Sequence, residues 1–163
     1  MCSSDLGNEV GKKNRQKVSR YFHASLIMYG CATIILELFF LSCRHLLPLV
    51  FTPISEIDEL IARALLILCV YLIFDGLQTI LGFLLKGMGM QKQACIGNII
   101  SFICIYFITA LHLAFYTFLE FYGLWIGFAT SCLSAATFYT IVYLRTDWIE
   151  LFKKIDIEIQ IKI

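Results

Sequence analysis

The sequence predicts an all-α membrane protein with four transmembrane helices. Hydrophobic residues make up 60% of the chain and charged residues only 15%, and the mean hydropathy is +0.81, which exceeds what a soluble domain uses. Apolar segments at about 21–43, 60–85, 94–117 and 121–144 each reach the roughly 20 residues that cross a hydrocarbon core. These segments are expected to be helices, because an open sheet leaves backbone groups unpaired in lipid.

The polar segment 1–20 is predicted to be a loop-like cytoplasmic segment ahead of the first span. It shows no basic stretch followed by a short apolar run and a cleavage site, so an internal span is expected to direct insertion. After the first span, Pro48 and Pro53 interrupt the path. Ser55 to Asp58 then offers a capping-box-like start for the second helix.

The distribution of Lys and Arg predicts the orientation of the 21–144 membrane part. Five precede the first span, two follow the second and four follow the last, whereas Arg44 alone falls on the opposite side and Arg63 lies inside the second span. By the positive-inside rule both termini are therefore predicted to be cytoplasmic.

The segment 145–163 is predicted to be a cytoplasmic amphipathic segment with an Ile-rich tail. Trp148, Leu151, Phe152 and Ile155 recur at helical spacing, which favours a short helix on the inner leaflet. The last nine residues alternate Ile with polar residues but have no partner strand, so a frayed end is expected.

Composition also excludes several classes of function. A formal charge of +1 argues against a nucleic-acid partner. The seven cysteines form no CxxC pair and no cluster with histidine, so neither a metal nor a disulfide nor any cofactor is predicted. No paired carboxylates or nucleophile and base pattern indicates an enzyme.

Asp75 is the most informative residue, because it lies near mid-membrane in the second span. On a helix it shares a face with Tyr71, Gln78 and Thr79. A charge at this depth costs about 2.5 to 3.5 kcal/mol even on the lenient insertion scale, so such residues usually face a cavity or a partner. Burial raises the pKa of a carboxyl and a nearby cation lowers it, so the site can exchange a proton for a cation. The alternative is a protonated Asp75 that only ties two helices together.

The remaining polar residues of the spans are predicted to have structural roles. Glu37 and His112 lie towards the outer ends of their helices, and Arg63 is expected to snorkel or to pair with Glu59. KGMGMQ lacks the pattern of a phosphate loop and is predicted to be a tight turn. A stripe of small residues every four positions predicts close helix packing: Gly123, Gly127, Ser131 and Ala135.

Taken together, these motifs resemble the C-terminal third of eukaryotic multidrug and toxic compound extrusion (MATE) antiporters. The resemblance covers nearly the whole chain except the Ile-rich tail. It rests on SSDLGNEVGKKN, PLVFT, DGLQTILGFLLKGMGMQKQACIGN, GLWIG and RTDW, in that order. It implies that the four helices form part of the C-lobe and that Asp75 is the acidic residue of the tenth helix, which takes part in proton or cation coupling. It also places Gln78 and Asn98 at motif positions.

The chain departs from the family pattern in three ways. Tyr106-Phe107-Ile108 stands where Gly-Leu-Pro is common, so the expected proline kink is absent, and Lys86 stands where Arg is usual. Family members have twelve helices, whereas this chain supplies four. The seventh helix, with the carboxylate expected to work with Asp75, is not among them.

The resulting hypothesis is a fragment of a multi-pass, secondary-active efflux antiporter in the plasma membrane or an organelle membrane. It would export organic cations, xenobiotics or metabolites in exchange for protons or sodium, with Asp75 as the coupling carboxylate and Tyr71, Gln78, Thr79 and Asn98 lining the cavity. Its partners would be the lipid bilayer and the missing N-terminal helices of the same transporter. The rival hypothesis is a stand-alone four-helix membrane protein with a structural or regulatory role.

Overall fold

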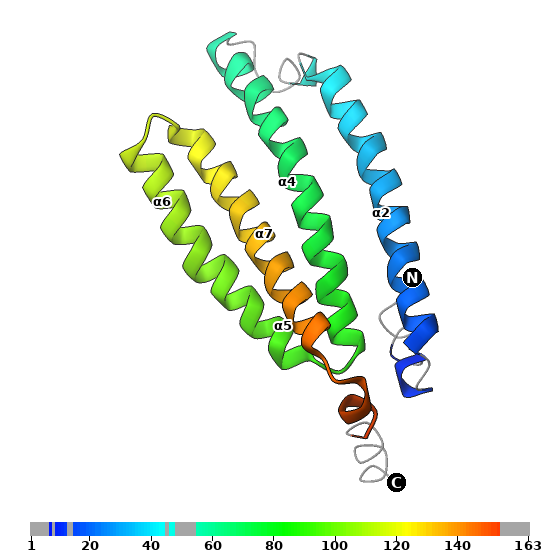
Figure 1. The fold of residues 1–163 in the computed structure, drawn as a ribbon. Coiled ribbons are helices and arrows are strands. Elements are labelled where there is room, and N and C mark those ends of the chain that lie inside the picture. Colours follow the sequence, from blue (N-terminus) through cyan, green and yellow to red (C-terminus); the bar gives the residue numbers. More distant parts are fainter. Residues whose placement is uncertain (1–6, 8, 13–14, 45, 48–54, 154–163) are drawn as a thin grey trace.

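The computed structural model describes residues 7, 9–12, 15–44, 46–47 and 55–153 of the chain. In this part the elements are α2 (Arg15–Cys43), α4 (Ser55–Gly87), α5 (Gln91–Asn98), η1 (Ile99–Ile105), α6 (Tyr106–Tyr116) and α7 (Glu120–Arg145) (Figure 1). Four spans in this part are long and apolar enough to cross a membrane: Arg15–Cys43, Glu59–Gly87, Gln91–Tyr116 and Glu120–Arg145. The predicted all-α class with four transmembrane helices is confirmed.

The first helix begins earlier than the sequence predicted. We expected a loop up to residue 20, but α2 starts at Arg15, because Arg, Gln and Lys are good helix formers that extend the helix beyond its apolar part. The second helix begins at Ser55, as its capping-box-like pattern predicted. Residues 148–153 are helical, and Trp148, Leu151 and Phe152 pack against the buried core cluster of the bundle. Pro48, Pro53 and the tail 154–163 lie outside the described residues.

The third span changes its helical geometry midway. Between α5 and α6, the seven residues of η1 form a π-helix, and the N–H of Tyr106 bonds the carbonyl of Ser101 five positions earlier. This wider turn lies directly before Tyr106-Phe107-Ile108, where the sequence lacks a proline. The span is therefore irregular at this position without a proline kink.

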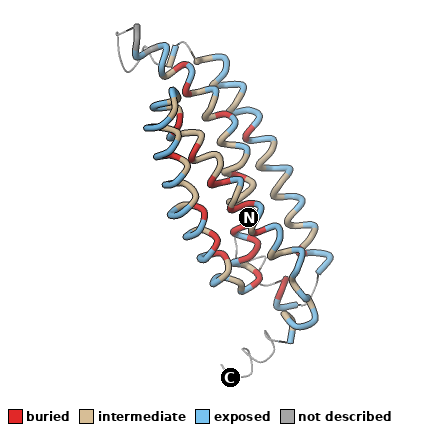
Figure 2. The backbone as a smooth tube through the Cα atoms, turned by 60° about the vertical axis from the view of Figure 1, so that its left-hand side comes forward, coloured by how far each residue is buried: buried red, intermediate tan, exposed pale blue. Residues whose placement is uncertain are grey.

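The helices α4 and α7 form the centre of the arrangement. The helix α7 packs against both α4 and α6, and α2 packs against the other side of α4 (Figure 1). Burial follows this order, because α7 is the most buried span and α2 the least. Buried residues lie on the facing sides of the helices and exposed residues on their outer sides (Figure 2). The outer sides carry many large apolar residues, as a surface against lipid requires.

The predicted small-residue stripe of α7 is confirmed as a packing surface. Gly123, Gly127, Ser131 and Ala135 are all buried. A Cβ built on Gly123 would lie 2.7 Å from the backbone carbon of Leu113, and one on Gly127 would lie 2.8 Å from the Cβ of Ala110. The backbones of α6 and α7 can therefore approach each other this closely only because Gly123 and Gly127 have no side chain.

The KGMGMQ segment forms the tight turn that the sequence predicted, between α4 and α5. Gly89 has a φ of +77°, the N–H of Gly89 bonds the carbonyl of Lys86 at 3.1 Å, and the N–H of Met90 bonds the carbonyl of Leu85 at 2.9 Å. This pair of bonds is the Schellman motif, which satisfies the last carbonyls of a helix around a left-handed residue.

Replacing Gly89 with alanine is expected to lower the free energy of unfolding by about 1 kcal/mol, because only glycine adopts this φ without strain. Thermal unfolding in detergent checks this value. Gly30→Ala is the matched control, since no atom lies within 4 Å of the added methyl group. Equal unfolding temperatures for the two variants would contradict the role given to the turn.

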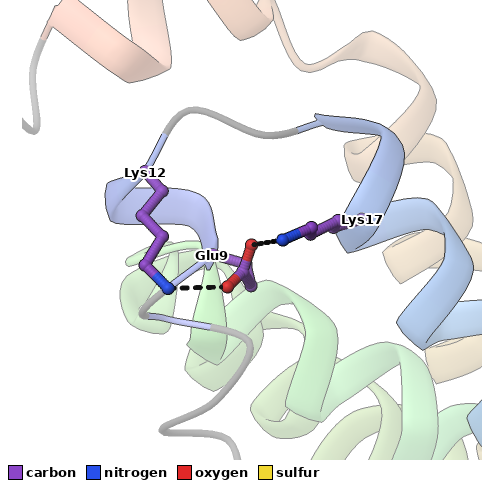
Figure 3. A network of polar contacts seen from close by, with 3 residues as sticks. All are labelled: Glu9, Lys12 and Lys17. Atoms are coloured by element: carbon purple, nitrogen blue, oxygen red, sulfur yellow. Dashed lines mark hydrogen bonds and ion pairs between the residues drawn. The ribbon is translucent and has the colours of Figure 1, made fainter.

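The N-terminal segment is attached to the end of the bundle where both described termini lie. Val10 and Val18 are buried in a cluster with Leu85, Met88 and Tyr139. Next to Val10, Glu9 is 7% exposed, and its carboxylate accepts a hydrogen bond of 2.9 Å from Lys12 Nζ (Figure 3). Lys17 Nζ lies 3.6 Å from its other oxygen. The ion pair with Lys17 joins the segment before α2 to the first turn of α2, whereas the Lys12 pair lies within that segment.

Acidification is expected to weaken this attachment. The hydrogen bond from Lys12 holds the pKa of Glu9 below its ordinary value of 4.5. Glu9 therefore contributes its full stabilisation of the folded state at any pH above its pKa in the unfolded chain. This contribution is lost as the pH falls through the lower pKa that Glu9 has in the folded state. Glu9→Gln should lower the unfolding temperature at neutral pH and reduce its change on acidification. An unchanged acid response in Glu9→Gln would show that another group is responsible.

Candidate functional site

Asp75 lies in the middle of α4, on the side that faces α7. Its side chain is half-buried, and the thiol of Cys132 on α7 donates a long hydrogen bond of 3.8 Å to Oδ1. Cys132 itself is fully buried. The carboxylate therefore lies between two spans, where the surrounding groups are less polar than water.

An aromatic cluster adjoins this carboxylate through Tyr71. Tyr71, one turn before Asp75, interacts with it electrostatically. The Tyr71 ring packs edge-on against Phe128 of α7 at 5.8 Å, and Phe128 lies 4.5 Å from the ring of Tyr106 on α6. Rings from three spans thus meet beside the acidic group.

The other side of α4 at this depth is covered by Tyr29 of α2. Its hydroxyl donates a hydrogen bond of 2.7 Å to the carbonyl of Leu72. Its ring lies on Gly76, since a Cβ built there would be 1.7 Å from two ring carbons. Gly76 follows Asp75 directly, so α2 contacts α4 where the carboxylate is attached.

The structure places the other predicted site residues at different depths. Tyr71 lies with Asp75, whereas Gln78 and Thr79 are half-buried closer to the turn, and Gln78 Nε2 donates to Thr79 Oγ1 at 3.4 Å. The hydroxyl of Tyr139 lies 2.7 Å from Asn98 Oδ1, in position to donate to it. Tyr139 follows Cys132 by seven residues, a rise of about 10 Å along α7. The structure therefore does not bring Asn98 to the carboxylate, but to a second polar centre nearer the chain termini.

Three further ionisable residues of the spans were singled out in the sequence. Arg63 donates a hydrogen bond to Glu59, which confirms the predicted pairing one turn into the span. Glu37 is half-buried on α2. His112 is exposed and stacks on Tyr116 at 5.6 Å.

Sequence reasoning missed three residues of this region. Cys132 was interpreted only as a packing residue, and Tyr29 and Tyr139 were not singled out. For Cys132 a signal exists, because it adjoins Ser131 in the small-residue stripe and so falls on a buried part of α7. Tyr29 and Tyr139 are ordinary aromatic residues in their spans, and their hydrogen bonds depend on helix pairing that one sequence does not reveal.

An open, apolar groove of about 440 Å³ lies between α4 and α7 and includes Val70 and Phe74 of α4 and Ile126 and Leu133 of α7. Within the described residues, no group of three or more His, Cys, Asp and Glu side chains could hold a metal ion. Asp75, whose carboxyl group can hold a proton or attract an organic cation, is not among the residues that line this groove. The fold and this site define a multi-pass helical membrane protein with an acidic residue inside the bundle.

Comparison with known proteins identifies the family. The family model described as MatE matches residues 3–112. The chain is 27% identical over 143 residues to "Multidrug and toxin extrusion protein 1" of Oryctolagus cuniculus, covering 88% of this chain and 25% of that protein. It is 25% identical to "Protein DETOXIFICATION 1" of Arabidopsis thaliana, covering 93% and 32%. The crystal structure of the eukaryotic MATE transporter AtDTX14 matches with a TM-score of 0.79 and 22% identity, over 94% of this chain and 36% of that chain.

The chain belongs to the MATE family of membrane transporters. The resemblance stated from the motifs is thereby confirmed, as is the multi-pass membrane location. The chain spans about a quarter to a third of the length of the curated relatives described above.

Proposed function

We propose that the chain is a segment of a secondary-active efflux antiporter that exports organic cations, xenobiotics or metabolites in exchange for protons. Asp75 would be its coupling carboxylate. The observation that carries the proposal is the half-buried position of Asp75 between α4 and α7, next to a fully buried thiol. The names of the relatives from O. cuniculus and A. thaliana, which refer to multidrug and toxin extrusion and to detoxification, support the same class of activity.

Competition for one carboxyl group explains how such a site couples two fluxes. A protonated Asp75 is neutral and has little attraction for a cation, whereas an ionised Asp75 attracts an organic cation, and the rings of Tyr71 and Phe128 provide apolar and cation–π surface for it. If each ligand favours a different conformation of the transporter, loading the proton on one side drives release of the cation there. Sodium is the alternative coupling ion for the same carboxylate.

The proposal includes the orientation and the partners of the chain. Both termini would be cytoplasmic, because Lys and Arg concentrate at that end of the spans. The groove between α4 and α7 is open, and it supports the proposal that further helices of the same transporter complete the cavity.

Efflux from vesicles tests the proposal. The complete protein that contains this segment, reconstituted in proteoliposomes, should move a fluorescent organic cation against its gradient when a pH gradient is imposed. A sodium gradient of the same size should have no effect. Transport that follows sodium alone would overturn the proton coupling, and no transport with either gradient would overturn the antiporter.

The second candidate is a stand-alone four-helix protein with a structural or regulatory role. Sequencing the transcript upstream of Met1 distinguishes the two candidates. Further apolar spans in frame support the transporter segment, whereas an in-frame stop codon close upstream supports the independent protein.

A further inference from the structure

The helix α2 carries a second polar stripe that the motifs do not explain. Ser25, Tyr29, Thr33 and Glu37 are spaced by four residues and therefore share one face. Thr33 is only 6% exposed, and the other three are half-buried. The large apolar residues of α2 are instead exposed, among them Ile27, Ile34, Ile35 and Leu38. The least buried span thus turns polar groups inward and apolar groups outward.

The polar stripe faces α4. Tyr29 contacts Leu72 and Gly76, as described above. Two turns further along α2, Glu37 lies close enough to the buried Cys69 of α4 to act on its thiol electrostatically. Cys69 precedes Asp75 by six residues, a rise of about 9 Å. Glu37 is therefore a second carboxyl group within the spans, at a different depth from Asp75 and between a different pair of helices.

The carboxyl group of Glu37 is incompletely satisfied. Its Oε1 is shielded from solvent and has no hydrogen-bond partner within the described part of the chain. The hydroxyl of Tyr29, on the same stripe, donates to the Leu72 carbonyl instead. A buried carboxylate without a partner is strongly disfavoured, whereas the protonated acid is neutral and tolerates this environment.

The other ionisable groups nearby do not supply an ion pair to this oxygen. Cys69 faces Glu37 from α4 and is a thiol. Arg63, nearer the end of α4, hydrogen-bonds Glu59. Arg44 follows Glu37 by seven residues beyond the end of α2. The other titratable residue of the α2 stripe is Tyr29, which is separated from Glu37 by Thr33.

We propose that Glu37 is a second proton-binding carboxyl group of this chain, separate from Asp75 and located between α2 and α4. Its ligand is a proton. Proton binding by Glu37 does not depend on transport by the chain, so it can be tested on its own.

Labelling with the hydrophobic reagent dicyclohexylcarbodiimide tests this proposal, because the reagent modifies protonated carboxyl groups within membranes. The full 163-residue chain in lipid vesicles is treated at several pH values, and modified peptides are quantified by mass spectrometry. We expect Glu37 to be modified at neutral pH and the extent of modification to fall as the pH is raised, because only the protonated carboxyl group reacts.

Glu59 is the matched control, because it is an exposed glutamate paired with Arg63 and should remain unmodified at neutral pH. Glu37→Gln should remove the Glu37 adduct and leave the extent of modification of Asp75 unchanged. Labelling of Glu37 no greater than that of Glu59 at every pH would overturn the proposal. If Glu37→Gln does not fold, the pH profile of the unmodified chain decides alone. A failed efflux assay with a positive labelling result would contradict the proposed function and leave this inference standing.

Discussion

Replacing Asp75 with asparagine in the complete transporter is expected to reduce proton-driven efflux to the level of vesicles without protein. Asparagine has nearly the same size and keeps an oxygen that can accept the thiol hydrogen bond from Cys132. It cannot ionise, so it neither releases a proton nor attracts a cation by charge. The substitution therefore removes the coupling chemistry while the helix packing stays in place. Efflux of a fluorescent cation under a pH gradient measures the effect.

The same helix offers a control for this prediction. Glu59→Gln removes an equal charge from α4, but at an exposed position where the carboxylate only pairs with Arg63. This variant should keep most of the efflux, because exposed ion pairs contribute about 0 to 1 kcal/mol. Efflux by Asp75→Asn at the level of the unmodified protein would refute the role proposed for Asp75.

Replacing Gly127 with leucine is expected to separate α6 from α7 and to lower the free energy of unfolding by about 3 kcal/mol. A Cβ on Gly127 already lies 2.8 Å from the Cβ and 3.0 Å from the Cα of Ala110. The Cα belongs to the backbone of α6 and the Cβ is fixed directly to it, so no rotation of a side chain can make room. The apparent unfolding temperature in detergent measures the loss.

Gly30→Leu is the control for this substitution. It introduces the same side chain in a transmembrane helix, but no atom lies within 4 Å of the added Cβ. The unfolding temperature of Gly30→Leu should therefore stay close to that of the unmodified chain. Equal losses in the two variants would show that leucine acts through something other than the contact between α6 and α7.

Much of the fold was predictable because lipid imposes simple rules on a sequence. Four apolar segments of sufficient length predict four spans, and a four-residue spacing of small residues predicts the face on which Gly123 and Gly127 pack. The ends of the helices were less predictable, since Arg15 to Arg20 form helix without being apolar. The π-helix at Ile99–Ile105 has no sequence signal comparable to a proline, so it was not expected.

The site was predictable only as far as one helix determines it. The position of Asp75 in the span and its face with Tyr71 follow from helical periodicity alone. Its contact with Cys132 depends on how α4 and α7 are placed relative to each other, and the spacing of residues within either helix does not contain that information. Asn98 was associated with Asp75 by the family motif, but its hydrogen bond with Tyr139 lies at another depth. The polar stripe of α2 could have been recognised from its four-residue spacing, although the unpaired oxygen of Glu37 could not.

The hydrogen bond from Tyr29 to Leu72 has a mechanical consequence for α4. In an α-helix, the carbonyl of residue 72 is also the acceptor for the N–H of residue 76, so the Tyr29 hydroxyl shares that acceptor with the helix itself. A side chain that enters the backbone ladder in this way is a recognised cause of helix bending, and it acts here beside a glycine. Any sliding of α2 that preserves this bond must therefore displace the α4 backbone within one turn of Asp75, so that movement of one span is transmitted directly to the acidic group on the next.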